Sequence, residues 1–398
     1  MKFLSAPLRE FFHKGDCVLL SLCLLASGFG LTLIYSATRW EGNNKAVLIQ
    51  LIGILLGVIT YILLTFVDFQ LFTEKNWRFL FAFGVIFILL LITPLGKEVG
   101  GNRNWLALDR IIPGFPLNIQ PNEIVKIPFI LLLSYQIFTI QSKEHDISSI
   151  PSVLQIGGHT VFMLGIIAAV CGDMGMCVIY TMIFITIAWA SGVKFRWFAL
   201  VGGGIIFTVV IIWLFILPET KFWTDYRIMR FRVVFDHTLD PQGKGFQQTR
   251  SLLAIASGRL LGQGYMNGLQ TQAPNSDALP ARHTDFIFSV CGEEFGLVGC
   301  IALLFILVLI VLRCVWVSTQ ANSLFNAYVC IGMAGMLLAQ IVLNVGMCLF
   351  ILPVMGLTLP FISYGGSSII TLFAAMGLVS SAKARALPSW LRNRNQVS

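Results

Sequence analysis

The sequence predicts an all-α, polytopic membrane protein with about ten transmembrane helices. Of its 398 residues, 57% are hydrophobic and only 12% are charged, and the mean hydropathy is +0.82. A soluble domain carries about 25% charged residues, so this composition excludes the soluble and disordered classes. Apolar stretches long enough to cross a bilayer recur along the chain. They lie at 17–37, 46–66, 77–94, 123–140, 153–171, 175–192, 197–217, 286–312, 326–352 and 366–382.

The basic residues predict the orientation of these spans. Thirteen Lys and Arg lie at the N-terminus, in alternate short loops and in the tail, against five in the opposite short loops. By the positive-inside rule, both termini are cytoplasmic. We expect one membrane domain over 1–398, with a cytoplasmic N-terminus (1–16), a large extracytoplasmic loop (218–285) between spans seven and eight, and a cytoplasmic tail (383–398). The net charge of +8 therefore reports topology rather than a nucleic-acid partner.

The outward side is where a reaction can be carried out. Two outward segments, 95–122 and 218–285, are long enough to build a site, whereas the inward loops are short. The chain has no GxxxxGK[ST] motif, so a cytoplasmic nucleotide site is not expected. Because no ATP is available outside the membrane, an outward reaction must draw its energy from an activated substrate.

Two charged residues open the fourth span. Glu123 and Lys126 are spaced i,i+3 and so share a helix face, directly after Pro121. One interpretation is an interfacial ion pair that anchors the helix end. The other is that carboxylate and ammonium line a polar cavity, because ionisable groups at membrane depth are costly.

Three further carboxylates lie beside apolar runs. Asp173 stands in the short turn between spans five and six, where we expect it to cap the sixth. Glu293 and Glu294 come early in span eight, and for both a role in polar packing is favoured over direct participation in chemistry.

The long loop holds candidate phosphate ligands. Residues 223–235 interleave Arg with aromatic residues, and Arg227 and Arg230 share a helical face. This pattern fits an amphipathic helix on anionic lipid or a guanidinium clamp for phosphate, and a phosphorylated lipid satisfies both. A second amphipathic stretch, 246–261, ends near Arg259, a further candidate for substrate binding. The glycines around it would allow close backbone approach.

The end of this loop is its most informative part. Asp285 lies at the outer mouth of span eight, where partial desolvation would suit a general base; the alternative is a helix N-cap. His283 is either a structural hydrogen-bonding residue or a substrate contact. Ahead of the last span, residues 359–368 carry no charge, so Ser363 offers only a hydroxyl, to a substrate or, like its neighbouring serines, as a helix cap.

Three motifs together resemble the SEDS family, the RodA and FtsW proteins, over roughly residues 15–385. They are Gln120-Pro-Asn-Glu-Ile-Val-Lys126, His283-Thr-Asp-Phe-Ile-Phe288 with Glu293-Glu-Phe-Gly296, and Leu359-Pro-Phe-Ile-Ser-Tyr-Gly-Gly-Ser-Ser368. The chain departs from the family at three places. Asn122 stands where the family usually has Ser, Cys171-Gly-Asp-Met-Gly175 where it has a Pro-Asp-Leu-Gly turn, and Pro280-Ala281 where it has Pro-Glu. The 264–272 segment favours the RodA branch, whereas 226–230 is closer to FtsW and its sporulation relatives.

The resemblance implies a peptidoglycan glycosyltransferase in the bacterial cytoplasmic (inner) membrane. Such an enzyme polymerises lipid II into β-1,4 glycan strands on the outer face, here for cell elongation and shape, with a class B penicillin-binding protein as partner. By motif match, Asp285 corresponds to the essential acidic residue. Arg103 and Trp105 correspond to the Arg-Trp pair of the outer loop, and Glu123 and Lys126 to the polar pair of span four.

In the mechanism that follows, Asp285 accepts the proton of the attacking sugar hydroxyl. Arg227, Arg230 and Lys126 neutralise the leaving diphosphate, or a divalent cation (Mg²⁺ or Mn²⁺) held by a carboxylate does so. No other cofactor is implied. The alternatives are an FtsW-like or SpoVE-like role in division or sporulation, a lipid II flippase, and a scaffold that only recruits a transpeptidase. A flippase commonly has internal inverted repeats, and none is visible here.

Overall fold

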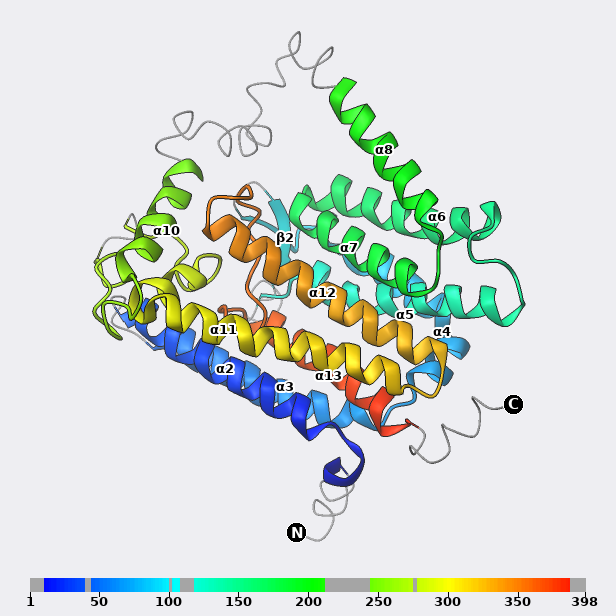
Figure 1. Cartoon of the computed structure of the whole chain (residues 1–398), viewed down its shortest axis with the longest axis horizontal. Coiled ribbons are helices and arrows are strands. Elements are labelled where there is room, and N and C mark those ends of the chain that lie inside the picture. Colours follow the sequence, from blue (N-terminus) through cyan, green and yellow to red (C-terminus); the bar gives the residue numbers. More distant parts are fainter. Residues whose placement is uncertain are drawn as a thin grey trace.

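The computed structural model describes residues 11–39, 44–99, 102–107, 118–211, 244–274 and 278–386, and a helix lies in each of the ten predicted apolar stretches (Figure 1). Residues 212–217, the end of the seventh stretch, lie outside the described residues. Within these ranges, eight helices are long and apolar enough to cross a membrane, and Met174–Ala190 is apolar but shorter. The helices are α2 (Cys17–Thr38), α3 (Lys45–Thr65), α4 (Phe69–Leu89) with the 3₁₀ turn η2 (Leu90–Ile92), α5 (Pro121–Ser142), α6 (Ile150–Ile166) with the π-helical turn η4 (Ile167–Cys171), α7 (Met174–Ala190), α8 (Phe195–Ile211), α11 (Ile287–Gln320), α12 (Leu324–Cys348) and α13 (Gly366–Ala384).

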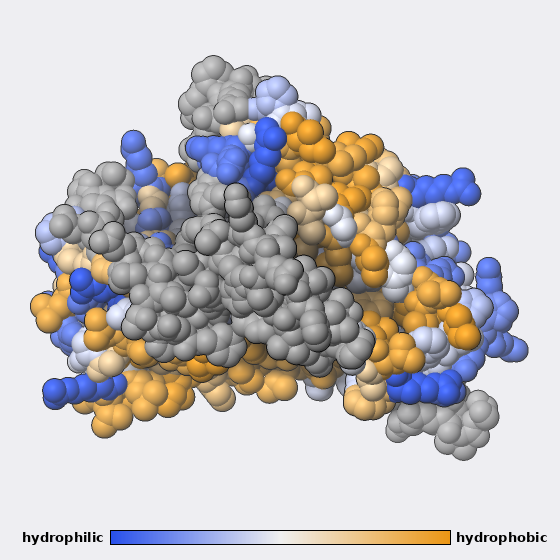
Figure 2. All heavy atoms as spheres, turned by 90° about the horizontal axis from the view of Figure 1, so that it is seen from above, coloured by the Kyte–Doolittle hydropathy of each residue, from blue (hydrophilic) through white to orange (hydrophobic). Residues whose placement is uncertain are grey.

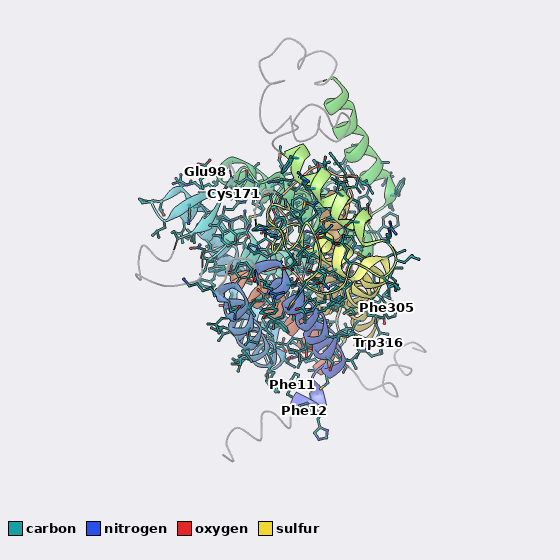
Figure 3. The ribbon with its side chains drawn as sticks, turned by 90° about the vertical axis from the view of Figure 1, so that its left-hand side faces the viewer. Phe11, Phe12, Glu98, Cys171, Phe305 and Trp316 are labelled. Atoms are coloured by element: carbon teal, nitrogen blue, oxygen red, sulfur yellow. The ribbon has the colours of Figure 1, made fainter. Side chains whose placement is uncertain are left out.

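One amphipathic helix and one β-hairpin of the described residues also bear on the site. The amphipathic helix α10 (Lys244–Gly258) precedes the Asp285 segment and overlaps the predicted second amphipathic stretch, 246–261. Strands β1 (Gly96–Val99) and β2 (Asn102–Leu106) form an antiparallel hairpin in which Lys97 pairs with Trp105. In the end-on view of Figure 3, this hairpin, marked by Glu98, lies on the same side as the end of η4, marked by Cys171.

Helix ends differ from the predicted bounds for local reasons. Helix α4 begins at Phe69 rather than at 77, because the Asp68 side chain accepts hydrogen bonds from the backbone of Gln70 and Leu71. Helix α12 ends at Cys348, four residues early, and Phe350 just beyond it has a left-handed φ of 61°. A pattern of apolar residues reports neither the Asp68 cap nor the left-handed backbone at Phe350.

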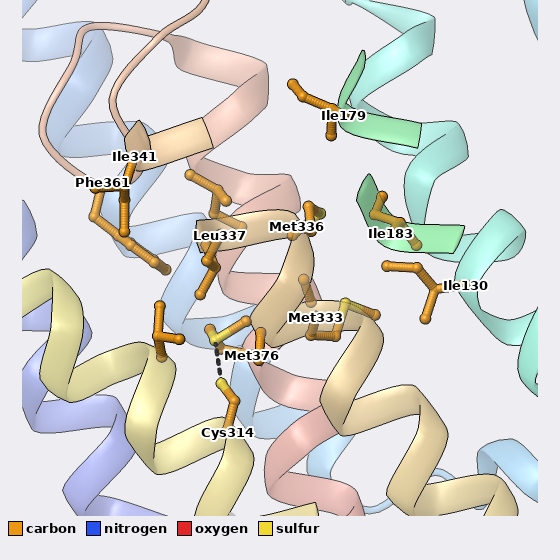
Figure 4. Packing of buried hydrophobic residues seen from close by; sticks show 14 of the residues in the cluster. Ile130, Ile179, Ile183, Cys314, Met333, Met336, Leu337, Ile341, Phe361 and Met376 are labelled. Carbon is orange, nitrogen blue, oxygen red and sulfur yellow. Dashed lines mark hydrogen bonds between the residues drawn. The ribbon is translucent and has the colours of Figure 1, made fainter. Parts of the chain in front are cut away.

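Helices α5, α12 and α13 form the centre of the bundle. Their spanning segments are 67%, 72% and 78% buried, against 22–39% for the other candidate spans. Figure 4 shows Met333, Met336, Leu337 and Ile341 of α12 packed between α7 on one side and α11 and α13 on the other. Apolar contact is therefore concentrated on α12, which reaches both halves of the bundle.

The outer faces of the helices are apolar. On α11, Leu297, Ile301, Phe305 and Leu312 are each more than half exposed. Seen from above, hydrophobic side chains cover the flanks, and hydrophilic ones gather toward the two ends of the long axis (Figure 2). A bundle with apolar flanks and its backbone hydrogen bonds closed within helices is what a bilayer requires. The chain is an integral membrane protein.

The two ends of the bundle differ in what they carry. We call the end at which α11 begins the Asp285 end; because consecutive helices alternate in direction, it also holds the starts of α5 and α7. At the other end, the buried Asp16 carboxylate accepts hydrogen bonds from Arg313 at 2.9 Å and 3.0 Å, and Lys383 lies 3.6 Å away. This ion pair joins the start of α2 to the ends of α11 and α13.

Candidate active site

The segment that carries Asp285 is fixed by three consecutive backbone carbonyls. The carbonyl of His283 accepts from the backbone N–H of Tyr364 at 2.9 Å. That of Thr284 accepts from the Ser363 hydroxyl at 2.6 Å, and that of Asp285 from the Asn344 amide at 2.8 Å. The main chain of 283–285 is thus held from α12 and from the loop before α13.

Asp285 itself is half-buried and does not begin the helix. The N-cap residue of α11 is Phe286, with no capping side chain. The alternative interpretation of Asp285 as N-cap is therefore wrong, because the residue lies one position too early. The Asp285 carboxylate faces Gly356, whose missing Cβ would lie 3.8 Å from Oδ2.

The loop before α13 is built around side-chain hydrogen bonds rather than a cap. The Ser363 hydroxyl accepts from the backbone N–H of Leu359, and Gln50 of α3 donates to the Ser363 carbonyl and accepts from the Gly365 backbone. The N-cap of α13 is Gly365, without a side-chain cap. The expected serine cap is therefore wrong; Ser363 ties this loop to the Asp285 segment instead.

Glu123 and Lys126 form a direct ion pair at the start of α5. The Lys126 ammonium lies 2.7 Å from Glu123 Oε2, and both side chains are almost fully buried. Next to them, Tyr180 of α7 donates to the Asn122 carbonyl at 3.1 Å. The pair predicted from the i,i+3 spacing is confirmed, and it lies inside the bundle rather than at an exposed interface.

Asp173 caps α7, as predicted, because its carboxylate accepts from the Met176 backbone at 3.1 Å. Its other oxygen accepts from the Asn104 amide of β2 at 2.5 Å, which holds the hairpin against the bundle. Burial raises the pKa of Asp173 above its usual range, and the charge of Glu123 acts in the same direction.

The two polar groups, around Asp285 and around Glu123, are joined by the loop 353–359. A Cβ on Gly175, two residues from Asp173, would touch Met355 and Leu357. The carbonyl of Leu357 accepts from the same Asn344 amide that holds Asp285, at 2.7 Å. One short loop therefore packs against α7 on one side and faces the Asp285 carboxylate on the other.

Helix α11 is broken at Gly296, and the chain after α10 fills the break. Gly296 has φ 67° and ψ −162°. Its neighbours Leu297 and Val298 donate to the carbonyls of Arg259 and Leu260, while Gln263 and Gly264 donate to those of Glu293 and Glu294. Gly258 and Gly262 lie so close to this backbone that no side chain would fit. The close backbone approach expected of these glycines is therefore present, and the segment that they approach is α11.

Glu293 and Glu294 have the predicted packing role. Glu293 accepts from the backbone of Gln270 and Thr271 and from the Thr271 hydroxyl. Glu294 accepts from Ser36 of α2 at 2.6 Å and from Gln272 at 3.0 Å. Both carboxylates thus hold the loop 265–272 against α2 and α11.

The remaining candidates are spread over this end of the molecule. Arg103 donates to the Thr93 carbonyl at 3.3 Å, and Trp105 is half-buried on the same strand. His283 packs its ring edge-on against Tyr364. Arg259 is exposed, and its carbonyl is bonded to α11. Arg227 and Arg230 lie outside the described residues.

Sequence reasoning missed the side chains that hold the site together. Asn344, Gln50 and Asn104 are buried, and each bonds a segment of the candidate site. Arg282, next to the recognised motif, donates to the carbonyls of residues 270, 271 and 273 and so fixes a loop. For Gln50 and Asn344, the available signal was an amide within an apolar run, since polar groups at membrane depth need partners.

The arrangement suits proton transfer and the binding of an anion. A half-buried carboxylate on a fixed main chain can accept a proton from a hydroxyl, and a buried ammonium can stabilise negative charge. Within the described ranges, no three His, Cys, Asp or Glu side chains are grouped so that they could hold a metal ion.

Comparisons with known proteins agree with this fold. Residues 17–386 match the model of the cell cycle protein family of FtsW, RodA and SpoVE. The chain is 30% identical to the peptidoglycan glycosyltransferase MrdB of Escherichia coli K12, over 88% of this chain and 90% of that protein. It is 29% identical to the probable peptidoglycan glycosyltransferase FtsW of Trichlorobacter lovleyi, over 96% of each.

Two solved structures are similar. A chain from a peptidoglycan synthase complex that coordinates polymerization and crosslinking superposes with a TM-score of 0.75 and 26% identity, covering 96% of this chain and 99% of that one. The rod shape determining protein RodA of Thermus thermophilus has the same fold, with a TM-score of 0.67, 24% identity and coverage of 94% and 98%. With a family match across nearly its whole length, this chain belongs to the FtsW, RodA and SpoVE family.

Proposed function

We propose that this chain is a peptidoglycan glycosyltransferase that polymerises lipid II into β-1,4 glycan strands at the outer face of the cytoplasmic membrane. The family and the names of relatives such as MrdB support this activity. The observation that carries the proposal is the Asp285 carboxylate, half-buried on a main chain held at three carbonyls, at the end of the bundle that also holds the buried Lys126.

In the proposed reaction, Asp285 accepts the proton of the acceptor sugar's 4-hydroxyl. The oxygen attacks the anomeric carbon of the donor, a carbon–oxygen bond forms, and the bond to the polyprenyl diphosphate breaks. Inversion at that carbon converts an α-linked donor into a β-1,4 linkage. Asp285 is the catalytic residue, and its carboxylate faces Gly356 of the loop 353–359.

The leaving diphosphate gains negative charge, which cations must stabilise. Lys126 is one candidate, and Arg227 and Arg230 are the others; a divalent cation, Mg²⁺ or Mn²⁺, would supply the same charge. Arg103, Trp105, Glu123, Arg259, His283 and Ser363 complete the proposed substrate contacts. For Ser363 and Arg103, the hydrogen bonds to backbone carbonyls favour support of the site over direct contact.

The proposed setting follows from charge and from the relatives. Both termini face the cytoplasm, and residues 1–398 act as one membrane domain with the 218–285 loop outside. A class B penicillin-binding protein is the proposed partner, supported by the similar chain that comes from a synthase complex for polymerization and crosslinking. A RodA-like role in elongation is preferred, with division or sporulation as the alternative.

The experiment that tests this activity separates synthesis from transport. The purified full-length chain, alone and with its transpeptidase, is incubated in detergent with lipid II, and the products are separated by gel electrophoresis. Glycan polymer is expected. If no polymer forms while the same protein moves lipid II across sealed vesicles, the chain is a flippase and the proposal is wrong.

A further inference from the structure

One side chain joins the proposed base to the loop that faces it. The Asn344 amide nitrogen lies 2.8 Å from the Asp285 carbonyl and 2.7 Å from the Leu357 carbonyl. Both partners are acceptors, so the amide must present its nitrogen, and its two N–H groups are both used. Asn344 is fully buried in α12, the central helix of the bundle.

The two carbonyls belong to the two segments that face each other at the candidate site, the Asp285 segment and the loop 353–359. Asp285 carries the proposed base, and Leu357 follows Gly356, the residue that faces its carboxylate. Gly356 has a left-handed φ of 69°, so the loop turns sharply at this point. The Asn344 amide therefore joins the Asp285 segment to this loop directly, beside the Ser363 hydroxyl, which bonds Thr284 and Leu359.

A second element holds the adjacent carbonyl. Ser363 donates to the Thr284 carbonyl at 2.6 Å from the loop before α13. The Cys348 thiol, one helical turn after Asn344, also lies 3.7 Å from the Asp285 carbonyl. The Asp285 main chain is thus tied to α12 and to the loop before α13, neither of which is its neighbour in sequence.

We propose that Asn344 is a positioning residue. It holds the main chain of Asp285 at a fixed distance from the loop 353–359, so that the carboxylate stays where it can accept the proton of the acceptor hydroxyl. This inference rests on the proposed role of Asp285 as base. A general base must lie within hydrogen-bond reach of its proton, and a displacement of about 1 Å can reduce a rate on the order of 100-fold.

The test compares three variants of the full-length chain with its transpeptidase. Asn344→Ala removes both hydrogen bonds, and Ser363→Ala removes the one to the adjacent carbonyl. Gln340→Leu is the matched control, one turn earlier on α12: Gln340 is equally buried, and its carbonyl oxygen has no hydrogen-bond partner among the described residues. Initial rates against lipid II concentration give kcat and KM, and thermal unfolding in detergent gives Tm.

Asn344→Ala is expected to lower kcat by roughly 10- to 100-fold with KM within about twofold, and Ser363→Ala to lower it less. Gln340→Leu is expected to keep kcat, because it removes a buried amide from the same helix without a hydrogen bond to the Asp285 main chain. If Asn344→Ala does not fold, Ser363→Ala carries the test: a fall in kcat at unchanged KM supports positioning, and a rise in KM at unchanged kcat contradicts it, because it reports a lost substrate contact. The inference is wrong if the folded variants keep kcat, or if kcat falls equally in Gln340→Leu in proportion to lost Tm.

The two proposals fail in different ways. If Asp285→Asn still polymerises lipid II at the wild-type rate, Asp285 is not the base and the proposed mechanism is wrong. If Asp285→Asn is inactive but Asn344→Ala and Ser363→Ala are as fast as wild type, only the positioning role is wrong.

Discussion

Lys126 Nζ lies 2.7 Å from Glu123 Oε2 within the first turn and a half of α5, with both side chains buried. Breaking a buried pair leaves one charge without its partner, which costs about 3–5 kcal/mol. Lys126→Met is therefore expected to unfold at a clearly lower temperature than wild type and to make no glycan. Thermal unfolding and lipid II polymerisation, measured on the same preparation, check both effects.

The double variant Glu123→Gln/Lys126→Met separates the contribution of the ion pair to stability from the proposed role of Lys126 in the reaction. With both charges removed, most of the lost stability is expected to return. Activity is expected to stay lost, because the proposed role of the Lys126 ammonium is to neutralise the leaving diphosphate. Polymerisation by a stable double variant would show that the pair is only structural.

The Asp16–Arg313 pair is expected to stabilise the far end of the bundle without affecting chemistry. Arg313→Met leaves the fully buried Asp16 with Lys383 at 3.6 Å, so the loss of unfolding free energy is expected to be at most about 3 kcal/mol. Polymerisation per folded molecule is expected to match wild type. A variant that keeps its Tm but loses activity would contradict this assignment.

Asp173 predicts a specific pH dependence of stability. Because burial raises its pKa in the folded state, the folded state binds more protons, and stability from this group falls as pH rises from the ordinary Asp pKa through the raised one. Asp173→Asn retains a capping oxygen and removes this loss. Because the carboxamide has one acceptor oxygen where Asp173 uses two, a pH-independent loss of the Asn104 bond is expected as well. The Tm of the variant is therefore expected to rise relative to that of wild type as the pH increases from 4 to 8; a constant difference over this range would exclude the titration of Asp173.

Because α11 is broken at Gly296, substitution of this glycine by any other residue is expected to destabilise the protein. Gly296 has a φ,ψ pair that only glycine adopts readily, and a Cβ there would overlap the backbone of Leu260 and Gly262. Gly296→Ala is expected to lose at least about 1–3 kcal/mol of unfolding free energy and to release the 259–264 segment. Limited proteolysis of that segment measures the release.

The matched control is Gly158→Ala on α6. No atom lies within 4 Å of its added Cβ among the described residues, and the position is helical. Alanine there is expected to stabilise by about 0.5–1 kcal/mol. Equal effects of the two substitutions would mean that the backbone conformation of Gly296 is unimportant.

The helices could be predicted because each needs only a long apolar run, and the ion pair at Glu123 because i,i+3 spacing fixes a helix face. The break at Gly296 could not, because it depends on carbonyls and N–H groups supplied by residues 259–264. Periodicity does not report such pairing between distant segments.

The candidate site was predicted as a set of charged residues, and the structure adds its supporting amides. Ser363 belongs to a recognisable motif and Arg282 lies next to one, yet both bond to backbone carbonyls. Asn344 lies in a mostly apolar helix, and only the fold brings it to Asp285 and Leu357. The sequence predicts which side chains can carry charge or form hydrogen bonds. The partner of each side chain depends on tertiary contacts, which the sequence pattern does not report.

The most direct measurement of the central claim is the initial rate of lipid II polymerisation by Asp285→Asn, which keeps the shape of the side chain and removes its basicity. The full-length chain is used with its transpeptidase, and Tm and co-purification of the partner confirm that the variant is intact. No glycan polymer is expected. Polymer formed at the wild-type rate by this variant would contradict the account.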